Sequence, residues 1–557
     1  MKEEQNYWTT LLARRLSRRR ALQAGIGLGG AALVGCAAAP AATPTPTKAP
    51  PTAPTPSPRP AASPTPVAKQ LDKLVAAFVR DLATLDPAVS ARQSEAMGFF
   101  PNLFDALVIM NRDMKPSPNL ALSWENPDDT TFLFKLRPGV KFHNGEDLDA
   151  TVVVAHIGRI RDPKTKSGIT QLISSLKSEE AVDSQTLRLV AKAPDPLLVR
   201  TLSDIYITPK KYSQESPDLL NTKPVGSGPY KFVKWVKDEA IELEALPSHF
   251  RMGAPRVKTF VESVVPAAAG RVAAFTTGAA DVIYNIPYED IPRIKQNPDL
   301  EVKFVQSTSN PAIMMSMFKE GPLQDKRVRQ AMNYAVDKGA ITKDLLQGYS
   351  KPMPVVVNSI CFGYDATIKP YPYDPKKAKE LLAAAGYANG FEVNFYLPDS
   401  TYPKYREYNQ AVANYLGEIG IKASIRPVPG THSAFVRDLR EKDQGPDGLV
   451  HYSASCGAEV DAYGVLVNYE EWDAKSRLGN GMYWSNPELD KALKDARATL
   501  DEKRRTELYS KALRIIYDEA YAIFLFDIPD IWGYNKKKLK AIYPRTSRLH
   551  AWDVEPA

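Results

Sequence analysis

Residue types that could carry covalent or metal chemistry are sparse in this chain and widely spaced. Its 557 residues include 6 histidines and 3 cysteines. No His-Glu-x-x-His run is present to hold zinc, and no Gly-x-Ser-x-Gly turn is present to expose a nucleophilic serine. Ser227, between Gly226 and Gly228, comes nearest to such a nucleophile, but Pro229 follows it directly. The sequence therefore favours a protein that is not an enzyme, and a secreted hydrolase using paired carboxylates stays open as the alternative.

His432 and His451 suggest a metal or a metal chelate, because imidazole is a common metal ligand. Neither histidine stands in a tight cluster of histidine, cysteine and carboxylate residues. A metal site needs a defined number of ligands in a defined geometry. We therefore interpret both as structural or surface histidines, and we expect neither a metal nor another cofactor.

Cys36 stands in a pattern typical of exported proteins. It ends the run Leu33-Val34-Gly35-Cys36, behind a Gly/Ala-rich apolar stretch and the three arginines at 18–20. This pattern resembles a bacterial lipoprotein lipobox, which implies a signal peptide over residues 1–36 and lipid attachment to the sulfur of Cys36. The alternative is a transmembrane anchor over residues 21–39, which is nearly long enough but has few large side chains.

The basic segment 17–23 resembles a twin-arginine export signal, with Ala21 where that signal usually has an aromatic residue. Export by the twin-arginine route or by the general secretory route therefore stays open. By either route, we expect the mature protein outside the cytoplasm, lipid-anchored to the outer face of the cell membrane, in the periplasm or at the cell surface.

A proline-rich linker follows the cysteine. Residues 37–68 hold 11 of the 46 prolines, together with many threonines and alanines. Such a composition favours extended polyproline II geometry and cannot form a core. We expect a disordered stalk between the lipid and the folded part.

The remaining chain has the composition of an ordinary globular protein, with 44% hydrophobic and 24% charged residues. The net charge is +8, and part of it comes from the arginines of the signal. The other charges are dispersed, so we expect a solvated surface and no nucleic-acid partner. Cys361 and Cys456 remain after lipidation of Cys36, and two such thiols outside the cytoplasm commonly pair. Their geometry is not given by the sequence, so a disulfide and two free thiols both stay open.

Interspersed helix and strand patterns indicate a mixed α/β protein. Asp325, Asp374 and Asn486 each stand where they could cap a helix, the last two before a proline, and 502–520 has the pattern of a long helix. Alternating apolar residues predict strands over 391–397 and 241–246. Residues 131–145 predict a strand, a Pro-Gly turn and a second strand.

The order of several short motifs resembles the extracellular solute-binding proteins of family 5, the dipeptide, oligopeptide and nickel class of ABC importers. The resemblance covers nearly all of residues 70–557. Each motif alone is weak evidence for the family, but the order and spacing of all of them along the chain are specific to it. The motifs are Thr84-Leu85-Asp86-Pro87, Phe104-Asp105-Ala106-Leu107, the run 119–146, Pro224 to Tyr230, Gly278-Ala279-Ala280-Asp281, Asp325 to Asp337 with Val328-Arg329-Gln330-Ala331, and Tyr373-Asp374-Pro375 to Gly386-Tyr387.

These motifs are interpreted as mainly structural: Gly228-Pro229 as a turn, and Arg329 as a buried or interface ion-pair partner. The resemblance implies a two-lobed α/β periplasmic-binding-protein (Venus-flytrap) fold with an extra subdomain in lobe I. Lobe I would take residues 70–305 and 520–557, with the subdomain over about 90–220. Lobe II would take residues 306–519.

The same resemblance implies a function in transport. A ligand would be captured between the lobes and delivered to an ABC permease in the membrane by a monomeric binding protein. A peptide is the expected ligand, with an oligosaccharide or a metal chelate as alternatives. A surface sensor or adhesin that kept the fold and lost the transporter also stays open.

The ligand site implied by the resemblance includes the wall segment 447–466. Peptide binders of the family hold the peptide amino terminus with an acidic residue there, and that position falls on Ala458 in this chain, which cannot bind an ammonium group. Cys456 falls where some of these proteins have a disulfide cysteine, so its partner would be Cys361. Candidate ligand contacts are Tyr452, Glu459, Asp461, Tyr463, Tyr483, Trp484 and Arg437.

Overall fold

The chain divides into two units, residues 1–66 and 67–557. The computed structural model describes residues 69–557 apart from 91–93, 401, 443, 458, 472–481, 483 and 546. Cys36, the expected signal and the expected linker therefore lie outside the described residues. Within the described ranges, no helix combines the length and the apolar character needed to cross a membrane.

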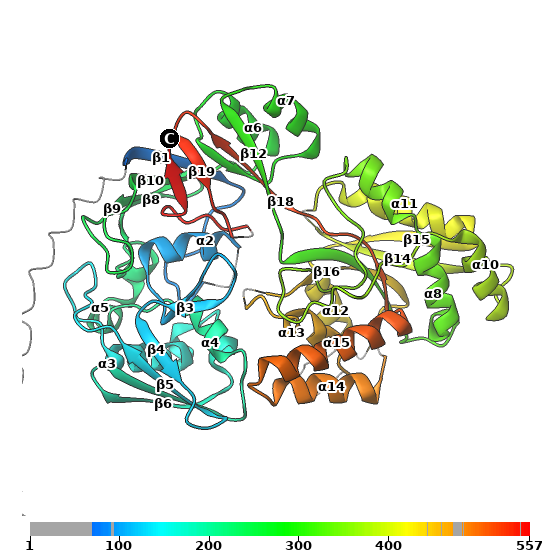
Figure 1. Ribbon diagram of the computed structural model, residues 1–557, viewed down its shortest axis with the longest axis horizontal. Coiled ribbons are helices and arrows are strands. Elements are labelled where there is room, and N and C mark those ends of the chain that lie inside the picture. The colour runs from blue at the N-terminus through cyan, green and yellow to red at the C-terminus, as the bar shows by residue number, and fades with distance from the viewer. Residues whose placement is uncertain are drawn as a thin grey trace, which may run out of the picture. The chain divides into compact units, whose positions relative to one another are not determined.

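Lobe I is the part of the second unit built on a mixed seven-stranded sheet (Figure 1). Its central strand is parallel to both neighbours, and Leu74, Ala76 and Ala77 in it are buried. A near-continuous apolar run of this kind is typical of a strand covered on both faces. In spatial order the strands are β12 (Leu300–Val305), β18 (Asp530–Asn535), β11 (Val282–Tyr284), β1 (Leu71–Phe78), β10 (Val257–Val264), β9 (Ala240–Ala245) and β8 (Tyr230–Val236).

A four-stranded antiparallel sheet with its own core lies within the 90–220 range expected for the subdomain. Its strands are β4 (Ala121–Glu125), β5 (Thr131–Leu136), β7 (Thr186–Ala191) and β6 (Leu176–Asp183). The prediction of a second strand after Pro138-Gly139 is wrong. Phe142 and Gly145 instead form a tight turn, in which Phe142 N–H donates to Glu146 O at 2.8 Å and Gly145 N–H to Phe142 O at 2.9 Å. Asp149 then caps α3 (Ala150–Arg161).

Lobe II is built on a five-stranded mixed sheet flanked by helices. Its strands are β15 (Ile421–Val428), β14 (Phe391–Pro398), β16 (Gly448–Ser455), β13 (Ser309–Met315) and β17 (Ala522–Phe524). The predicted caps are confirmed, because Asp325, Asp374 and Asn486 each accept a backbone N–H at a helix start. These helices are α8 (Lys326–Ala335), α10 (Pro375–Ala384) and α14 (Pro487–Arg497), and the predicted long helix is α15 (Glu502–Glu519).

Two two-stranded ladders and nine further α-helices also belong to the described residues. The two-stranded ladders are β2 (Val108–Met110) with β3 (Pro116–Pro118), and β19 (Leu539–Ile542) with β20 (Val554–Pro556). The other helices are α2 (Ser94–Leu103), α4 (Leu198–Thr201), α5 (Lys210–Glu215), α6 (Ala268–Thr276), α7 (Ile291–Lys295), α9 (Lys338–Ala340), α11 (Tyr405–Glu418), α12 (His432–Arg440) and α13 (Tyr463–Leu466).

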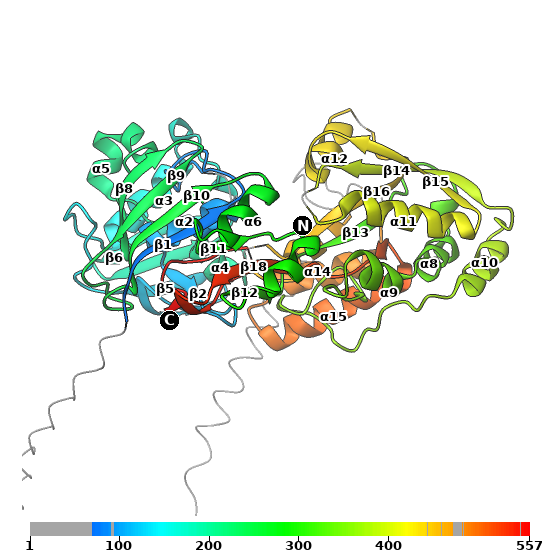
Figure 2. The same cartoon turned by 90° about the horizontal axis from the view of Figure 1, so that it is seen from above.

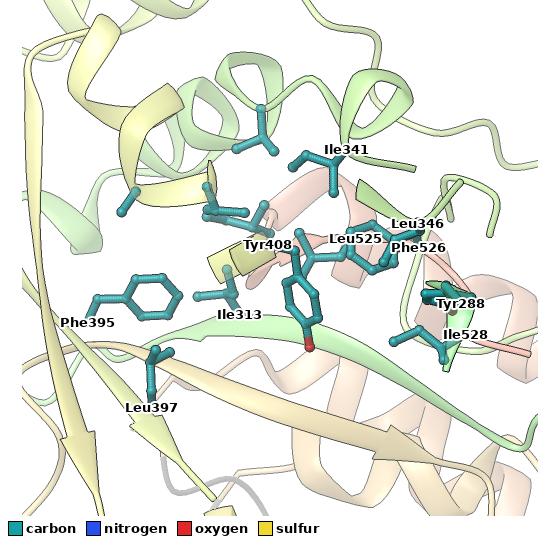
Figure 3. Close-up of a cluster of buried hydrophobic side chains, with 14 of the residues drawn as sticks. Tyr288, Ile313, Ile341, Leu346, Phe395, Leu397, Tyr408, Leu525, Phe526 and Ile528 are labelled. Carbon is teal, nitrogen blue, oxygen red and sulfur yellow. The ribbon is translucent and has the colours of Figure 1, made fainter. Parts of the chain in front are cut away.

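Two chain segments connect the two sheets, from β12 to β13 and from β17 to β18. Because β17 pairs with β13, the chain returns to lobe I after Phe524, later than the expected crossing near 520. A buried apolar cluster that includes Ile313, Tyr408, Phe526 and Ile528 contains residues of the second crossing (Figure 3). The cluster contains residues of both sheets, among them Val302 of β12 and Phe395 of β14.

Candidate ligand-binding site

A cavity of about 400 Å³ lies at the carboxyl ends of strands from both sheets. In lobe II, β14 is parallel to β15 and β16, so the three strands end together. The helix α12 lies beside β14 and β16 on the side facing lobe I (Figure 2). Ligands of open α/β sheets commonly bind outside the carboxyl ends of strands. The lining residues are Arg80, Pro398, Asp399, Ser400, Tyr402, Thr431, His432, Ser433, His451, Tyr452 and Ser453.

Arg80 is the contribution of lobe I to this cavity. It follows β1, the central parallel strand, and the backbone beside it is fixed by the buried carboxylate of Asp81. That carboxylate accepts hydrogen bonds from Trp235 Nε1 at 3.1 Å and from Asp238 N at 2.7 Å, and it pairs with Lys237 at 3.1 Å. Arg80 itself is exposed.

The lobe II wall of the cavity is rich in hydroxyl groups. Tyr402 and Ser453 hydrogen-bond through their oxygens at 2.5 Å, and burial raises the pKa of Tyr402 well above its ordinary value. Asp399 Oδ2 accepts from Gly430 N at 2.9 Å, which ties the end of β14 to the start of α12. Pockets that recognise small molecules combine apolar walls with a few such polar groups.

His432 and His451 lie in the same wall, and burial lowers the pKa of each to about 3. Both are therefore neutral at physiological pH. His451 Nε2 shares a hydrogen bond of 2.9 Å with Tyr408, and His432 packs against Tyr452 with ring centroids 4.7 Å apart. Within the described residues, no three histidine, cysteine or carboxylate side chains are grouped as metal ligands.

The structure separates the candidate contacts predicted from the sequence. Tyr452 lines the cavity, whereas Tyr463 lines another cavity of about 280 Å³ with Arg497 and residues of the lobe I subdomain. Tyr483 lies outside the described residues. Trp484 is 2% exposed; it stacks on Tyr469 and Tyr521 and donates to Tyr469 O at 3.2 Å, so it belongs to the core.

Arg437 does not line the cavity. Its side chain is exposed on α12 and pairs with Asp438 at 3.3 Å and Glu441 at 3.9 Å on the same helix. Glu459 is half-buried, and its backbone carbonyl accepts from Arg200 Nη1 of the subdomain at 3.1 Å. This bond is a direct contact between lobe I and lobe II.

Asp461 has an internal partner for each of its carboxylate oxygens. It is 0% exposed, and it accepts from Arg505 Nη2 at 2.5 Å, Tyr509 Oη at 2.8 Å and Tyr463 N at 3.0 Å. A carboxylate held in this way has no exposed atom for a ligand. The interpretation of Asp461 as a ligand contact is therefore corrected to a buried structural ion pair.

The remaining motifs also have structural roles. Arg329 forms the predicted buried ion pair, with Nη2 at 3.0 Å from Glu519 Oε2. Ser227 is 3% exposed and donates to Asp105 at 3.0 Å. A Cβ on Gly226 would lie 1.8 Å from Leu103 O, so the glycine permits a close backbone approach. Cys361 and Cys456 form a disulfide with Cα atoms 6.1 Å apart.

Arg80, Asp399 and Tyr402 line the cavity but were not among the residues predicted from the sequence. The carboxyl-end rule gives a signal for Asp399, because it lies two residues after the predicted strand 391–397. Arg80 similarly follows the apolar run of 74–79. Tyr402 has no such local signal.

The sequence profile of the bacterial extracellular solute-binding proteins, family 5 Middle, matches residues 115–464. The match spans more than half of the chain. The protein belongs to family 5 of the extracellular solute-binding proteins. The two-lobed α/β fold expected from the sequence is confirmed by solved structures with the same fold.

Three proteins illustrate the similarity of this family 5 chain to its relatives. The glutathione-binding protein GsiB of Shigella flexneri serotype 5b (strain 8401) is 30% identical over 462 residues, which cover 80% of this chain and 87% of the relative. The structure of HbpA2 from Haemophilus parasuis superposes with a TM-score of 0.77 at 24% identity, covering 87% of this chain and 100% of that one. The ABC transporter-associated periplasmic binding protein DppA from Helicobacter pylori, in complex with peptide STSA, gives 0.70 at 24% identity, covering 88% and 98%.

Proposed function

We propose that this protein captures a peptide or peptide-like solute between its lobes and delivers it to an ABC importer. The observation that carries the proposal is the cavity of about 400 Å³, which is lined by Arg80 from lobe I and by strand ends of lobe II. A ligand in this cavity would contact both lobes. Such a ligand favours the closed state by its differential affinity for that state.

The chemistry of the wall supports a polar ligand of peptide type. Hydroxyl groups of Ser400, Ser433 and Ser453 stand beside the rings of Tyr402 and Tyr452. Such groups can accept and donate hydrogen bonds to amide groups, and the rings supply apolar surface. The glutathione-binding relative and the peptide-bound DppA structure support the same ligand class. Because Ala458 cannot bind an ammonium group, peptide recognition would rely on other residues.

The proposed cellular arrangement follows from the N-terminal residues. Cys36 would be lipidated after cleavage of the signal, and the proline-rich residues 37–68 would tether the folded unit to the outer face of the membrane. The protein would act there as a monomer beside its permease. The sequence predicted that lobe II ends at 519; because β17 pairs with β13, the boundaries proposed here are 70–305 and 525–557 for lobe I and 306–524 for lobe II.

Native mass spectrometry of the purified protein, compared with its denatured mass, tests the proposed function. We expect an extra mass in the native state that fragments into amino acids. A sugar or a metal chelate in its place would contradict the peptide assignment and keep the solute-binding role. Turnover of the bound molecule on incubation would instead support the secreted hydrolase.

A further inference from the structure

We propose that Arg200 is a latch that holds the two lobes together in the absence of a ligand, and that it thereby sets ligand affinity without touching the ligand. Arg200 does not line the cavity of about 400 Å³. The inference goes beyond the proposed function, and it rests on that proposal only in requiring that the lobes open and close.

Arg200 extends from the subdomain of lobe I to a backbone carbonyl of lobe II. It lies in the short helix α4 and is 7% exposed. Its Nη1 donates to Met114 O in lobe I and to Glu459 O in lobe II, at 3.1 Å in each case. The bond to Met114 lies within one lobe and can persist when the lobes separate, whereas the bond to Glu459 requires that they touch. The guanidinium is therefore positioned in lobe I before the lobes close, which limits the entropy lost on closing.

The loop of lobe II that presents Glu459 O is held in one conformation. Val460, the next residue, has a φ of 51°, a left-handed backbone conformation that β-branched residues rarely adopt. Phe362 N–H donates to Val460 O at 2.9 Å, and the adjacent Cys361 is bonded to Cys456 at the start of the loop. A strained backbone persists only where its surroundings fix it. The carbonyl of Glu459 is thus oriented by lobe II itself.

Lobe II also places an aromatic ring beside the guanidinium. The carbon atom at the centre of the Arg200 guanidinium lies 5.7 Å from the centroid of the Phe362 ring, within the range of a cation–π interaction. Burial lowers the pKa of Arg200, but an arginine side chain stays charged at neutral pH. The contact is therefore a charge-assisted hydrogen bond supported by a ring, and this type is stronger than a bond between neutral groups.

An apolar contact between the lobes accompanies the latch. Met110 and Met114, from the β2–β3 hairpin of lobe I, belong to a buried cluster whose other buried members all come from lobe II, and Phe362 packs against this cluster. In Figure 1, α4 lies on the lower side of lobe I, whereas β18, which follows the second crossing, lies above it. A contact away from the crossings separates when the lobes rotate apart, so opening breaks the hydrogen bond and the ring contact together.

The ratio of closed to open protein without a ligand tests the latch. Pulsed electron paramagnetic resonance measures the distance between spin labels on keto amino acids that replace Lys177 in lobe I and Lys494 in lobe II, both of which are exposed. The same labels are placed in Arg200→Met, Arg200→Lys and Phe362→Leu. Circular dichroism and denaturant unfolding confirm that each variant is folded.

Arg188→Met is the matched control for loss of an arginine in the subdomain. Arg188 pairs with Glu180 at 2.8 Å, and both residues belong to lobe I. This pair does not connect the lobes, so its loss should leave the ratio of closed to open protein unchanged.

We expect the ligand-free wild-type protein to show a short and a long distance between the labels. Arg200→Met should lower the ratio of closed to open protein by about 10- to 100-fold, the equivalent of one hydrogen bond to a charged group. Arg200→Lys should lower it less, and Phe362→Leu by about a few-fold. In calorimetric titrations with a library of free tripeptides, the affinity of Arg200→Met should fall by the factor by which its closed fraction falls.

The possible failures are distinguishable. An unchanged ratio in Arg200→Met, or in Arg200→Lys and Phe362→Leu if Arg200→Met does not fold, would overturn the inference and leave the proposed function intact. A ligand-free wild-type protein that shows only the long distance would overturn it as well. A loss of tripeptide affinity at an unchanged ratio would make Arg200 a ligand contact and not a latch. If no tripeptide binds the wild-type protein, the peptide function fails, and a ratio lowered in Arg200→Met would still support the latch.

Discussion

Two sets of opposite charges in this protein differ in how their hydrogen-bonding capacity is used. In the first pair, Asp461 and Arg505 are 0% and 2% exposed, and Tyr509 completes the cluster. In the second, Arg80 and Asp399 are exposed at a cavity and make no ion pair with each other or with another described residue. Residue type alone would place both pairs in a ligand site.

The comparison shows that a structural charge has its hydrogen-bonding atoms occupied by other protein groups, whereas a charge available for binding does not. Removing one member of a buried ion pair leaves the other charge desolvated and without a counterion. Each member is therefore needed to stabilise the other. An exposed charge at a cavity keeps its water until a ligand replaces that water. The same carboxylate chemistry therefore contributes to the stability of lobe II at Asp461 and is available for binding at Asp399.

The largest expected effect comes from breaking the buried pair. Asp461→Asn should lower the free energy of unfolding by about 3–5 kcal/mol, because it leaves the charge of Arg505 buried without a counterion. Denaturant unfolding measures the change. Asp438→Asn, in an exposed pair on α12, should change the stability by less than about 1 kcal/mol.

Ligand affinity separates the two interpretations of Asp461. The folded Asp461→Asn protein should keep its affinity, because the carboxylate has no surface exposed to the cavity. If affinity for a cationic ligand is lost while stability stays at the wild-type value, Asp461 is a ligand contact after all.

Sequence reasoning succeeded where the signal was local. Asp325 and Asp374 indicated helix starts because capping involves residues adjacent in the chain, and these starts are confirmed. The cavity is different, because Arg80, Asp399 and Tyr402 come from separate segments that only the tertiary fold brings together. Trp484 was misassigned because an aromatic residue near a wall segment has the same sequence pattern whether it faces a ligand or stacks in the core.

The second largest effect on stability is expected from removing the disulfide, which holds the segment that carries Asp461. Cys361 and Cys456 are 95 residues apart in the chain, and Phe362 N–H donates to Val460 O at 2.9 Å beside them. Replacing both cysteines with serine should lower the free energy of unfolding by about 2–4 kcal/mol, in line with disulfides that close long loops. Reductant should destabilise the wild-type protein and leave the double variant unaffected. Alkylation of two thiols in the unreduced protein would contradict the pairing.

Asp530 lies at the second crossing between the lobes and should make stability depend on pH. Burial raises its pKa from 3.8 to about 6, although Tyr284 Oη donates to it at 2.7 Å. Between about pH 4 and pH 6 the folded state thus binds a proton that the unfolded state has lost, so the contribution of Asp530 to stability falls as pH rises. Above pH 6 this buried carboxylate is charged and destabilising.

Asp530→Asn removes that titration and keeps an oxygen for Tyr284. The variant should match the wild-type protein near pH 4 and exceed it by up to about 3 kcal/mol at pH 7, the free-energy equivalent of the pKa shift. Urea unfolding at several pH values measures the difference between the two proteins. A difference that stays constant from pH 4 to pH 7 would show that Asp530 does not titrate in this range.

The smallest expected effect tests whether the wall of the cavity contributes to affinity through its hydroxyls. Tyr402→Phe removes the hydrogen bond to Ser453 but keeps the ring. Because a neutral hydrogen bond contributes about 0.5–1.5 kcal/mol, we expect peptide affinity to fall by only a few-fold. Tyr405→Phe is the matched control, since its hydroxyl donates to Pro398 O and does not line the cavity. Calorimetric titration should find an affinity loss in Tyr402→Phe alone. An equal loss of affinity in both variants would mean that the effect arises from the packing of the strand end. The hydroxyl groups of the wall would then have a structural role, like the buried group of Asp461, Arg505 and Tyr509.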